Sequence, residues 1–321
     1  MRKVAAVVAA SIGALAVGVG AVQAQSYPKG PISIVVGYSA GGFADTVTRI
    51  IAERMSATLG QPVVVENQPG AASNVAALSV SRDKADGYTI LATTTSVAIN
   101  QTLYGSLEYS MDDLTPVAVP VAAPEVLAVH PEFPAQSLEE FLSYAGSNAV
   151  TYATAGVGSG SHIAAGYFLS ELAGVKAIHV PFGGGAPAVG AVLGQQVGAT
   201  AITIPAIAAQ FQSGGLNCLA VASPQRTPIA PDCPTYSESG FDDFVAQSWV
   251  GFFVPAGTNP EIVATLNTTV NEVIADPAVA ERLETLGNTI QTLDAAETAD
   301  FVSGEVSSWR ERATALDLRI E

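Results

Sequence analysis

The sequence predicts an α/β protein built from two domains, and three observations support this. Short runs rich in β-branched residues alternate with stretches in which apolar residues recur at helical spacing. Glycine-rich turns separate several of these runs. Residues 25–321, which follow an apolar leader, are long enough for two domains of about 150 residues, each with its own core. Strands that alternate with helices are typical of βαβ units and a parallel sheet.

The first elements follow this alternating pattern in order. Residues 32–36 predict a buried strand, and a glycine-rich turn leads from it into a helix over 44–59. The next strand is expected at 62–66. A helix at 74–81 then separates it from a third strand at 88–92. These elements predict the first α/β unit.

A second α/β unit is expected in the middle of the chain. Its predicted strands lie at 127–129, 150–154, 177–180, 198–202 and 218–222, and its predicted helices at 138–144, 162–172 and 187–193. One more strand is expected at 248–254, followed by helices at 260–274, 277–286 and 295–313.

The leader predicts export. Arg2 and Lys3 precede an apolar run over 4–22, and Ala24 ends a triplet that fits an A-x-A-like cleavage site. The alternative is an uncleaved membrane anchor. The run is rich in Gly and Ala, however, and lacks the roughly 20 strongly apolar residues that a stable span needs. We therefore predict a signal peptide over 1–24 and an exported, soluble mature chain.

Charge and histidine content exclude several function classes. The chain has 13 Lys and Arg against 29 Asp and Glu, for a net charge of −16. A chain with this charge balance lacks the positively charged surface that nucleic-acid binding requires. With three histidines and no Cys-x-x-Cys pair, the sequence predicts neither a metal nor a cofactor. An anionic ligand would have to be attracted by local dipoles against the overall negative charge.

The two cysteines, Cys218 and Cys233, leave two alternatives. They lie 15 residues apart in a chain predicted to be exported, where disulfides persist. A disulfide closing such a loop would stabilise the fold by about 3 kcal/mol. The other possibility is a pair of buried free thiols.

One motif raises the possibility of a serine hydrolase. The segment Gly37-Tyr38-Ser39-Ala40-Gly41 matches G-x-S-x-G between a predicted strand and a helix, with Ser39 as the nucleophile. That fold needs strands before the serine and a late histidine as base. Ser39 lies near the start of the mature chain, however, and His179 is the last histidine. The early position of Ser39 and the lack of a late histidine therefore disfavour a secreted hydrolase.

The same turn has a second interpretation as an anion site. A glycine-rich turn that opens a helix leaves backbone N–H groups unpaired at the positive end of the helix dipole. Gly41 and Gly42 allow close approach of a ligand, and the Ser39 hydroxyl can donate. An ordinary tight turn stays open as an alternative. We expect Arg49, further along the helix, to face solvent or Glu53.

Two further polar turns follow predicted strands. Residues 156–162 read GVGSGSH, with Ser161 as the expected N-cap of the next helix, and residues 93–96 read TTTS. The first is not a dinucleotide fingerprint, because Ser161 stands where the third glycine is required. Open α/β sheets bind ligands at the carboxyl ends of their strands. We therefore expect both turns to face the ligand.

Nine groups of residues resemble one known family along nearly the whole mature chain. They occur in the family's order: Tyr38-Ser39-Ala40-Gly41-Gly42-Phe43-Ala44-Asp45, Val63-Val64-Val65-Glu66-Asn67-Gln68-Pro69-Gly70-Ala71, Asp86-Gly87-Tyr88-Thr89, Ile99-Asn100 with Leu103-Tyr104, Ser161-His162-Ile163-Ala164-Ala165, His179-Val180-Pro181-Phe182, Pro187-Ala188, Pro234-Thr235 with Glu238-Ser239-Gly240, and Pro255-Ala256-Gly257-Thr258. They resemble the substrate-binding proteins of tripartite tricarboxylate transporters, also called the Bug receptor family.

The resemblance implies a type II periplasmic-binding-protein fold, with two α/β domains and a ligand cleft between them. The first domain would comprise 25–123 plus 247–321, and the second 124–246. The chain would be a periplasmic, monomeric receptor, not an enzyme, that closes over a small carboxylate and delivers it to membrane permease subunits. A periplasmic sensor for a signalling partner is the alternative use of such a receptor.

The predicted ligand contacts combine these turns with positions implied by the resemblance. They are Tyr38, Ser39, Ala40, Gly41, Gly42, Phe43, Asp45, Thr94, Thr95, Ser159, Gly160, Ser161, His162, Phe182, Gly183 and Thr203.

The sequence departs from the family pattern at five positions near these contacts. Gly and Thr are expected where Phe43 and Ala44 stand, Tyr and Lys where Phe182 and Gly183 stand, and Asp where Ile202 stands. All five changes make the cleft less polar. We therefore expect an aromatic or otherwise apolar-bodied carboxylate, or a dicarboxylate, in preference to a tricarboxylate, with Phe43 and Phe182 as stacking surfaces. Family drift without meaning for specificity is the alternative.

Overall fold

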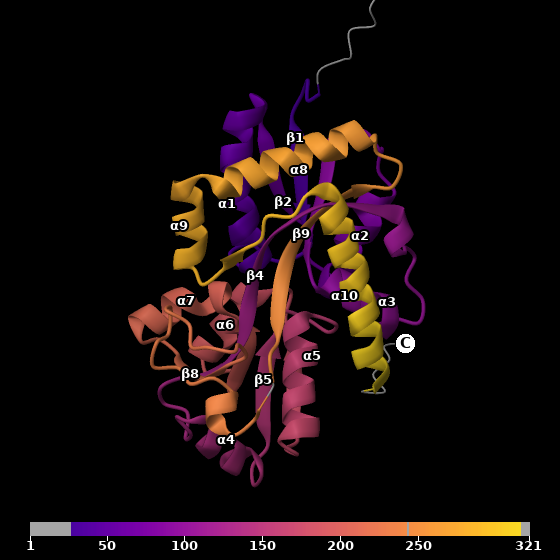
Figure 1. Cartoon of the computed structure of the whole chain (residues 1–321). Helices are drawn as coiled ribbons and strands as arrows, with labels where there is room; N and C mark the ends of the chain where they lie inside the picture. The colour runs from indigo at the N-terminus through magenta and orange to yellow at the C-terminus, as the bar shows by residue number, and fades with distance from the viewer. Residues whose placement is uncertain (1–26, 243, 316–321) are drawn as a thin grey trace, which may run out of the picture.

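The computed structural model describes residues 27–242 and 244–315 (Figure 1). The predicted signal peptide over 1–24 lies outside these residues. No helix in the described part of the chain is long and apolar enough to span a membrane. The described strands form a mixed sheet in the order β2-β1-β3-β9-β4-β7-β5-β6, with β8 and β10 also paired to β4. The predicted α/β class is confirmed.

The first half of the sheet is parallel at its outer edge. Its strands are β1 (Ile32–Val36), β2 (Val63–Asn67) and β3 (Thr89–Thr94), with β1 in the middle. The associated helices are α1 (Phe43–Leu59), α2 (Asn74–Ser81) and α3 (Ser96–Leu103), and short 3₁₀ turns lie at Ala71–Ser73 and Met111–Asp113. The sequence did not predict α3. Its first residue, Ser96, belongs to the hydroxyl-rich run that we expected to be only a strand end.

Two long antiparallel strands connect the halves, β4 (Leu114–Val129) and β9 (Gln247–Pro255) (Figure 1). The pairing of β4 with β9 ends at Pro124 and Gln247, and from Glu125 onward β4 pairs with β7. These antiparallel pairs stand beside the parallel pairs that the alternating pattern predicted, so the sheet is mixed. The domain limits predicted close to this point stay a prediction.

Prolines explain why only the last residues of β4 were predicted from sequence. Pro116, Pro120 and Pro124 recur every fourth residue, and proline cannot donate a ladder hydrogen bond. The β4–β9 register shifts twice between Pro116 and Val121, so the strand accommodates the prolines at irregular positions.

The second half repeats the parallel arrangement. Its strands are β5 (Val150–Thr154), β6 (Ala177–Pro181) and β7 (Ala199–Thr203), with β8 (Asn217–Val221) paired to β4. Its helices are α4 (Leu138–Ala145), α5 (Gly160–Tyr167), α6 (Gly185–Leu193) and α7 (Ile204–Ser213), with a 3₁₀ turn at Ser237–Ser239. The helix predicted over 162–172 ends earlier, because a π-helical turn at Phe168–Leu172 follows α5. The sequence did not predict α7.

The end of the chain returns to the first half. It forms α8 (Pro260–Ala275), α9 (Pro277–Thr285), β10 (Thr289–Ile290) and α10 (Ala295–Ala315), and α10 runs beside α3 (Figure 1). Val263 and Leu266 of α8 enter the same buried cluster as Ile51 of α1. Chain that is distant in sequence therefore completes the first core.

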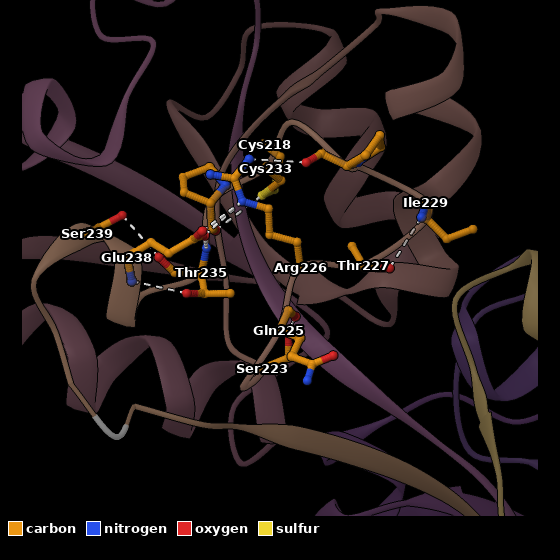
Figure 2. The surroundings of a disulfide bond; sticks show 12 residues. Cys218, Ser223, Gln225, Arg226, Thr227, Ile229, Cys233, Thr235, Glu238 and Ser239 are labelled. Atoms are coloured by element: carbon orange, nitrogen blue, oxygen red, sulfur yellow. Dashed lines mark hydrogen bonds and ion pairs between the residues drawn. A yellow bond between two sulfur atoms is a disulfide. The ribbon is translucent and has the colours of Figure 1, made fainter.

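The two cysteines are joined in a disulfide between β8 and the loop that follows it (Figure 2). Their Cα atoms lie 5.4 Å apart, which agrees with the first of the two sequence alternatives. In the same loop, the Arg226 guanidinium contacts the Glu238 carboxylate at 2.8 Å, and the Thr235 backbone N–H donates to that carboxylate at 2.8 Å. The disulfide therefore links the loop after β8 covalently to that strand in the second half.

Candidate functional site

A small cavity lies where the strands and turns of the two halves meet. Its free volume of about 30 Å³ has room for about two water molecules. Both halves and both connecting strands contribute to its lining: Tyr38, Phe43, Ala44, Thr94, Glu125, Ala155, Ser159, Gly160, Ser161, Gly185, Ile202, Thr203 and Ser248. We call it the central cavity.

Helix starts form much of the central cavity. They contribute Phe43 and Ala44 of α1, Gly160 and Ser161 of α5, Gly185 of α6, and Thr203 immediately before α7. The first N–H groups of a helix have no intrahelical acceptor and carry the positive end of its dipole. No Lys or Arg occurs among the described residues that line the cavity. The positive potential for an anion therefore comes from backbone dipoles.

Hydroxyl groups form one wall from the first half. The Tyr38 hydroxyl donates to Ser96 Oγ at 2.7 Å and lies 2.9 Å from Thr94 Oγ1. Burial raises the pKa of Tyr38 to about 12, so its hydroxyl stays neutral at physiological pH. This wall therefore presents polar groups without adding charge.

The opposite wall carries the start of α5. Ser159 is its N-cap, because the Ser159 Oγ accepts the His162 backbone N–H at 3.2 Å. This corrects the expectation for Ser161, which lies inside the helix because α5 begins at Gly160. Ser161 Oγ lies 3.0 Å from Ser159 Oγ. A Cβ atom on Gly160 would lie 2.3 Å from Ser248 Oγ, so a side chain at this position would displace the Ser248 hydroxyl from its place beside α5.

The cavity contains a buried acid that the sequence analysis missed. Glu125 is 5% exposed, and its Oε1 accepts a hydrogen bond from Ser248 Oγ at 2.6 Å. Its Oε2 has no partner within the described part of the chain. Burial raises the pKa of Glu125 to about 7, although the bond from Ser248 lowers it. One signal was available, since Glu125 is the single charged residue of β4.

The two halves touch beside the cavity. The Ser39 backbone N–H and hydroxyl both donate to the Gly183 carbonyl, at 3.0 and 3.1 Å. A Cβ atom on Gly42 would lie 3.3 Å from the Gly185 backbone N. The turn before α1 therefore lies against the turn before α6. Ala40 and Gly41 lie on the exposed part of the first turn.

Asp45 lies behind this turn, outside the cavity lining. Its carboxylate accepts the Gly41 backbone N–H, the Asn67 side-chain amide and the Arg49 guanidinium, at 2.8 to 3.0 Å. Burial acts to raise the pKa of Asp45, but these donors outweigh it and the pKa is lowered. Arg49 pairs with Asp45 and Asn67 and not with Glu53, but its side chain is 48% exposed and lies outside the cavity lining, which agrees with the expected solvent-facing position.

The three histidines each bond groups other than Ser39. His162 Nδ1 accepts the Gly158 backbone N–H, His179 Nε2 lies 2.6 Å from Thr154 Oγ1, and His130 Nδ1 accepts the Glu132 backbone N–H. The rings of His162 and His179 stack 4.0 Å apart. A serine nucleophile needs an adjacent base, and Ser39 donates to a carbonyl instead. The hydrolase interpretation therefore lacks its geometry.

A neighbouring cavity of about 480 Å³ shares Tyr38 and Ala155 with the central cavity. Phe182 and Gly183 line it, whereas Phe43 lines the central cavity. The two predicted stacking surfaces therefore belong to different cavities. Within the described ranges, His, Cys, Asp and Glu side chains form no group of three that could hold a metal ion.

The structure gathers part of the predicted site. The predicted residues that line the central cavity are Tyr38, Phe43, Thr94, Ser159, Gly160, Ser161 and Thr203. The others lie around it. Thr95, for example, is buried and its Oγ1 accepts the Trp249 backbone N–H. Ligand contacts for all of these residues stay predictions.

Comparisons with known proteins agree on one family. The model of the tripartite tricarboxylate transporter family receptor matches residues 47–318. BugT of Bordetella pertussis is 33% identical over 294 residues, which cover 90% of each chain. The structure of the periplasmic binding protein BugD has a TM-score of 0.88 and 33% identity, covering 92% of this chain and all of that one.

A ligand-bound structure is similar to the same extent. MatC (Rpa3494) from Rhodopseudomonas palustris with bound malate has a TM-score of 0.84 and 33% identity, with 89% of this chain and 99% of that chain covered. The chain therefore belongs to the tripartite tricarboxylate transporter receptor family. It is a substrate-binding receptor and not an enzyme, and its fold is the two-domain binding-protein fold.

Proposed function

We propose that the chain binds a small carboxylate in the central cavity, between its two domains. One observation carries this proposal: four helix starts and a set of hydroxyls surround a cavity whose described lining contains no Lys or Arg. Each charge-assisted hydrogen bond contributes about 1.5 to 3 kcal/mol. Four or five such bonds are enough for binding at about micromolar Kd.

The rest of the ligand would lie against less polar surfaces. Phe43, Ala44 and Ile202 of the central cavity and Phe182 of the neighbouring cavity favour an aromatic acid or a dicarboxylate over a tricarboxylate. Malate, the ligand of the similar MatC, is a dicarboxylate. The central cavity itself is small, so a larger ligand would extend toward the neighbouring one or require the domains to open.

We further propose that the receptor acts in the periplasm as a monomer and hands its ligand to the permease subunits of a tripartite transporter. The family description supports a transport role. Opening would occur by hinge motion at the two connecting strands, close to Glu125 and Gln247. The proposed domains are then 25–123 plus 247–321 and 124–246.

A thermal-shift screen of the purified protein against mono-, di- and tricarboxylates tests carboxylate binding. A ligand present at about 100 times its Kd should add about 2.7 kcal/mol of stability, because it binds only the folded chain. We expect di- or aromatic acids to give larger shifts than citrate. If citrate gives the largest shift, the preference is wrong, and if no acid shifts the melting curve, the carboxylate proposal fails.

A matched pair of variants locates the site. Gly42→Val places a side chain against the Gly185 backbone N, and it should weaken binding at least tenfold. Gly30→Val is the control, because a Cβ at Gly30 meets nothing within 4 Å. Equal affinity of both variants in calorimetry would place the ligand elsewhere.

Uptake measurements test delivery. Cells should lose accumulation of the labelled ligand when either this receptor or the permease subunits are deleted, and only the matching gene should restore it. Unchanged uptake after both deletions would contradict the transport role.

A further inference from the structure

Two buried oxygen atoms of the central cavity have no hydrogen-bond partner in the described part of the chain. They are Glu125 Oε2 and Thr203 Oγ1, on residues that are 5% and 4% exposed. The two residues are register partners across the β4–β7 pair, so their side chains are neighbours on one face of the sheet. Both residues line the cavity.

We infer that this pair binds an ammonium group of the ligand, and that the ligand is therefore an amino-carboxylate, not a plain organic acid. The inference rests on the proposed carboxylate function and adds the ligand's second charged group. Glu125 would determine this specificity by direct contact.

The chemistry of the two atoms favours an ammonium over other partners. An ammonium has three N–H donors, enough for Glu125 Oε2 and Thr203 Oγ1 together, whereas a ligand hydroxyl has only one. Ser248 already donates to the other carboxylate oxygen, so Oε2 is the atom that a ligand would meet. Calcium or magnesium sites need six or more oxygen ligands, and Glu125 is the only carboxylate among the described residues that line the cavity.

The distribution of charge in the cavity also favours a ligand that carries both a carboxylate and an ammonium group. Helix starts supply positive potential for the ligand's carboxylate, and Glu125 supplies a negative charge beside them. Glu125 takes part in none of the ion pairs among the described residues. A plain dicarboxylate would place its second negative charge near this acid, in a chain with a net charge of −16. An amino-carboxylate would place its carboxylate at the helix starts and its ammonium group at Glu125.

The upward shift of the Glu125 pKa to about 7 agrees with a missing counter-charge, since burial is its largest cause. The other titratable group of the described cavity lining is Tyr38, whose pKa is raised to about 12 and which stays neutral. A bound ammonium would hold Glu125 ionised.

Calorimetry at pH 8 with matched ligand pairs tests the inference. Each pair differs by one amino group: succinate and aspartate, glutarate and glutamate, 3-phenylpropionate and phenylalanine. In the wild-type receptor the amino member of the best-binding pair should bind roughly tenfold more tightly or better, as expected for a charge-assisted hydrogen bond. In Glu125→Gln that ratio should fall to within about threefold.

Two further variants keep the test decisive if Glu125→Gln folds poorly. Thr203→Val removes one unpartnered oxygen at nearly constant shape and should lower the ratio several-fold. Glu108→Gln changes an exposed acid outside the cavity lining and should leave the ratio unchanged. The measurement is a ratio of affinities, so a general loss of stability does not mimic the expected result.

Three results would overturn the inference. In the first, the wild type binds both members equally. In the second, it prefers the plain acid, as it would if a protonated Glu125 donated to a ligand carboxylate. In the third, Glu125→Gln keeps the wild-type ratio. If the folded wild type binds no acid of either kind, the proposed carboxylate function fails as well, which distinguishes the two failures.

Discussion

Two buried carboxylates near the ligand cavity, Asp45 and Glu125, have opposite environments. Asp45 is 2% exposed and accepts hydrogen bonds from a backbone N–H, an amide and a guanidinium, so its pKa is lowered despite burial. Glu125 is 5% exposed and accepts one hydrogen bond, so burial raises its pKa to about 7. Burial alone therefore does not define the role of an acid. The number of donors around it does.

The two environments indicate a structural role for Asp45 and a ligand-binding role for Glu125. Asp45 ties the turn before α1 to β2 through Asn67, and its oxygens are used inside the protein. Glu125 leaves an oxygen unused in the cavity, and a buried acceptor without a partner costs about 1 to 3 kcal/mol. A protein can retain a buried acceptor without a partner where a bound ligand supplies the missing hydrogen bond, and such acceptors are typical of binding sites.

Removing Asp45 should have the largest effect. Asp45→Ala leaves the Gly41 N–H and the Asn67 amide without their acceptor, and we expect a loss of roughly 3 kcal/mol of unfolding free energy. Urea unfolding at pH 7 measures it. Glu108→Ala breaks an exposed ion pair with Arg82 and should cost less than about 1 kcal/mol. Equal losses would show that Asp45 does not hold the turn.

The comparison also predicts opposite pH dependences. An acid with a raised pKa stabilises the folded state at low pH, and that contribution is lost as pH rises from 4.5 through about 7. Glu125→Gln should therefore gain up to about 3 kcal/mol over the wild type between pH 4.5 and 8. Urea unfolding of both proteins across this range measures the gain.

For Asp45, whose pKa is lowered, the sign reverses. Its contribution is present at neutral pH and is lost as pH falls below its ordinary range. Asp45→Asn should therefore differ most from the wild type at neutral pH and least in acid. A difference between Glu125→Gln and the wild type that stays constant with pH would contradict the contrast between the two acids.

The smallest expected effect concerns the single donor to Glu125. Ser248→Ala removes the 2.6 Å hydrogen bond, which should destabilise the ionised acid by about 1.5 kcal/mol. The midpoint of the Glu125-dependent stability change should then move above pH 7 by about one unit. A double-mutant cycle with Glu125→Gln isolates this coupling. A midpoint that does not move would mean that Ser248 contributes nothing to the ionisation of Glu125.

Much of the fold and half of the site were accessible from the sequence. Glycine and hydroxyl turns after predicted strands led to Tyr38, Thr94, Ser159 and Ser161, which do line the cavity. Glu125 and Ser248 could not be found this way, because they lie on long apolar strands without a turn motif. Their importance depends on where β4 and β9 cross between the halves.

The sequence by itself determined the α/β class, most elements and the family. Strand and helix periodicity, capping and turn glycines all act between near neighbours in the chain. Tertiary structure decided which turns meet, that β4 and β9 run antiparallel, and that Glu125 is buried beside Ser248. Those outcomes depend on contacts such as that of Glu125 with Ser248, 123 residues apart, and no local sequence pattern predicts that these two residues pair. Two of the three donors to Asp45, in contrast, lie only four residues from it in the chain. Asp45 and Glu125 differ because Asp45 has donors in its own turn and helix, whereas folding places Glu125 in a cavity with a single donor from a distant strand.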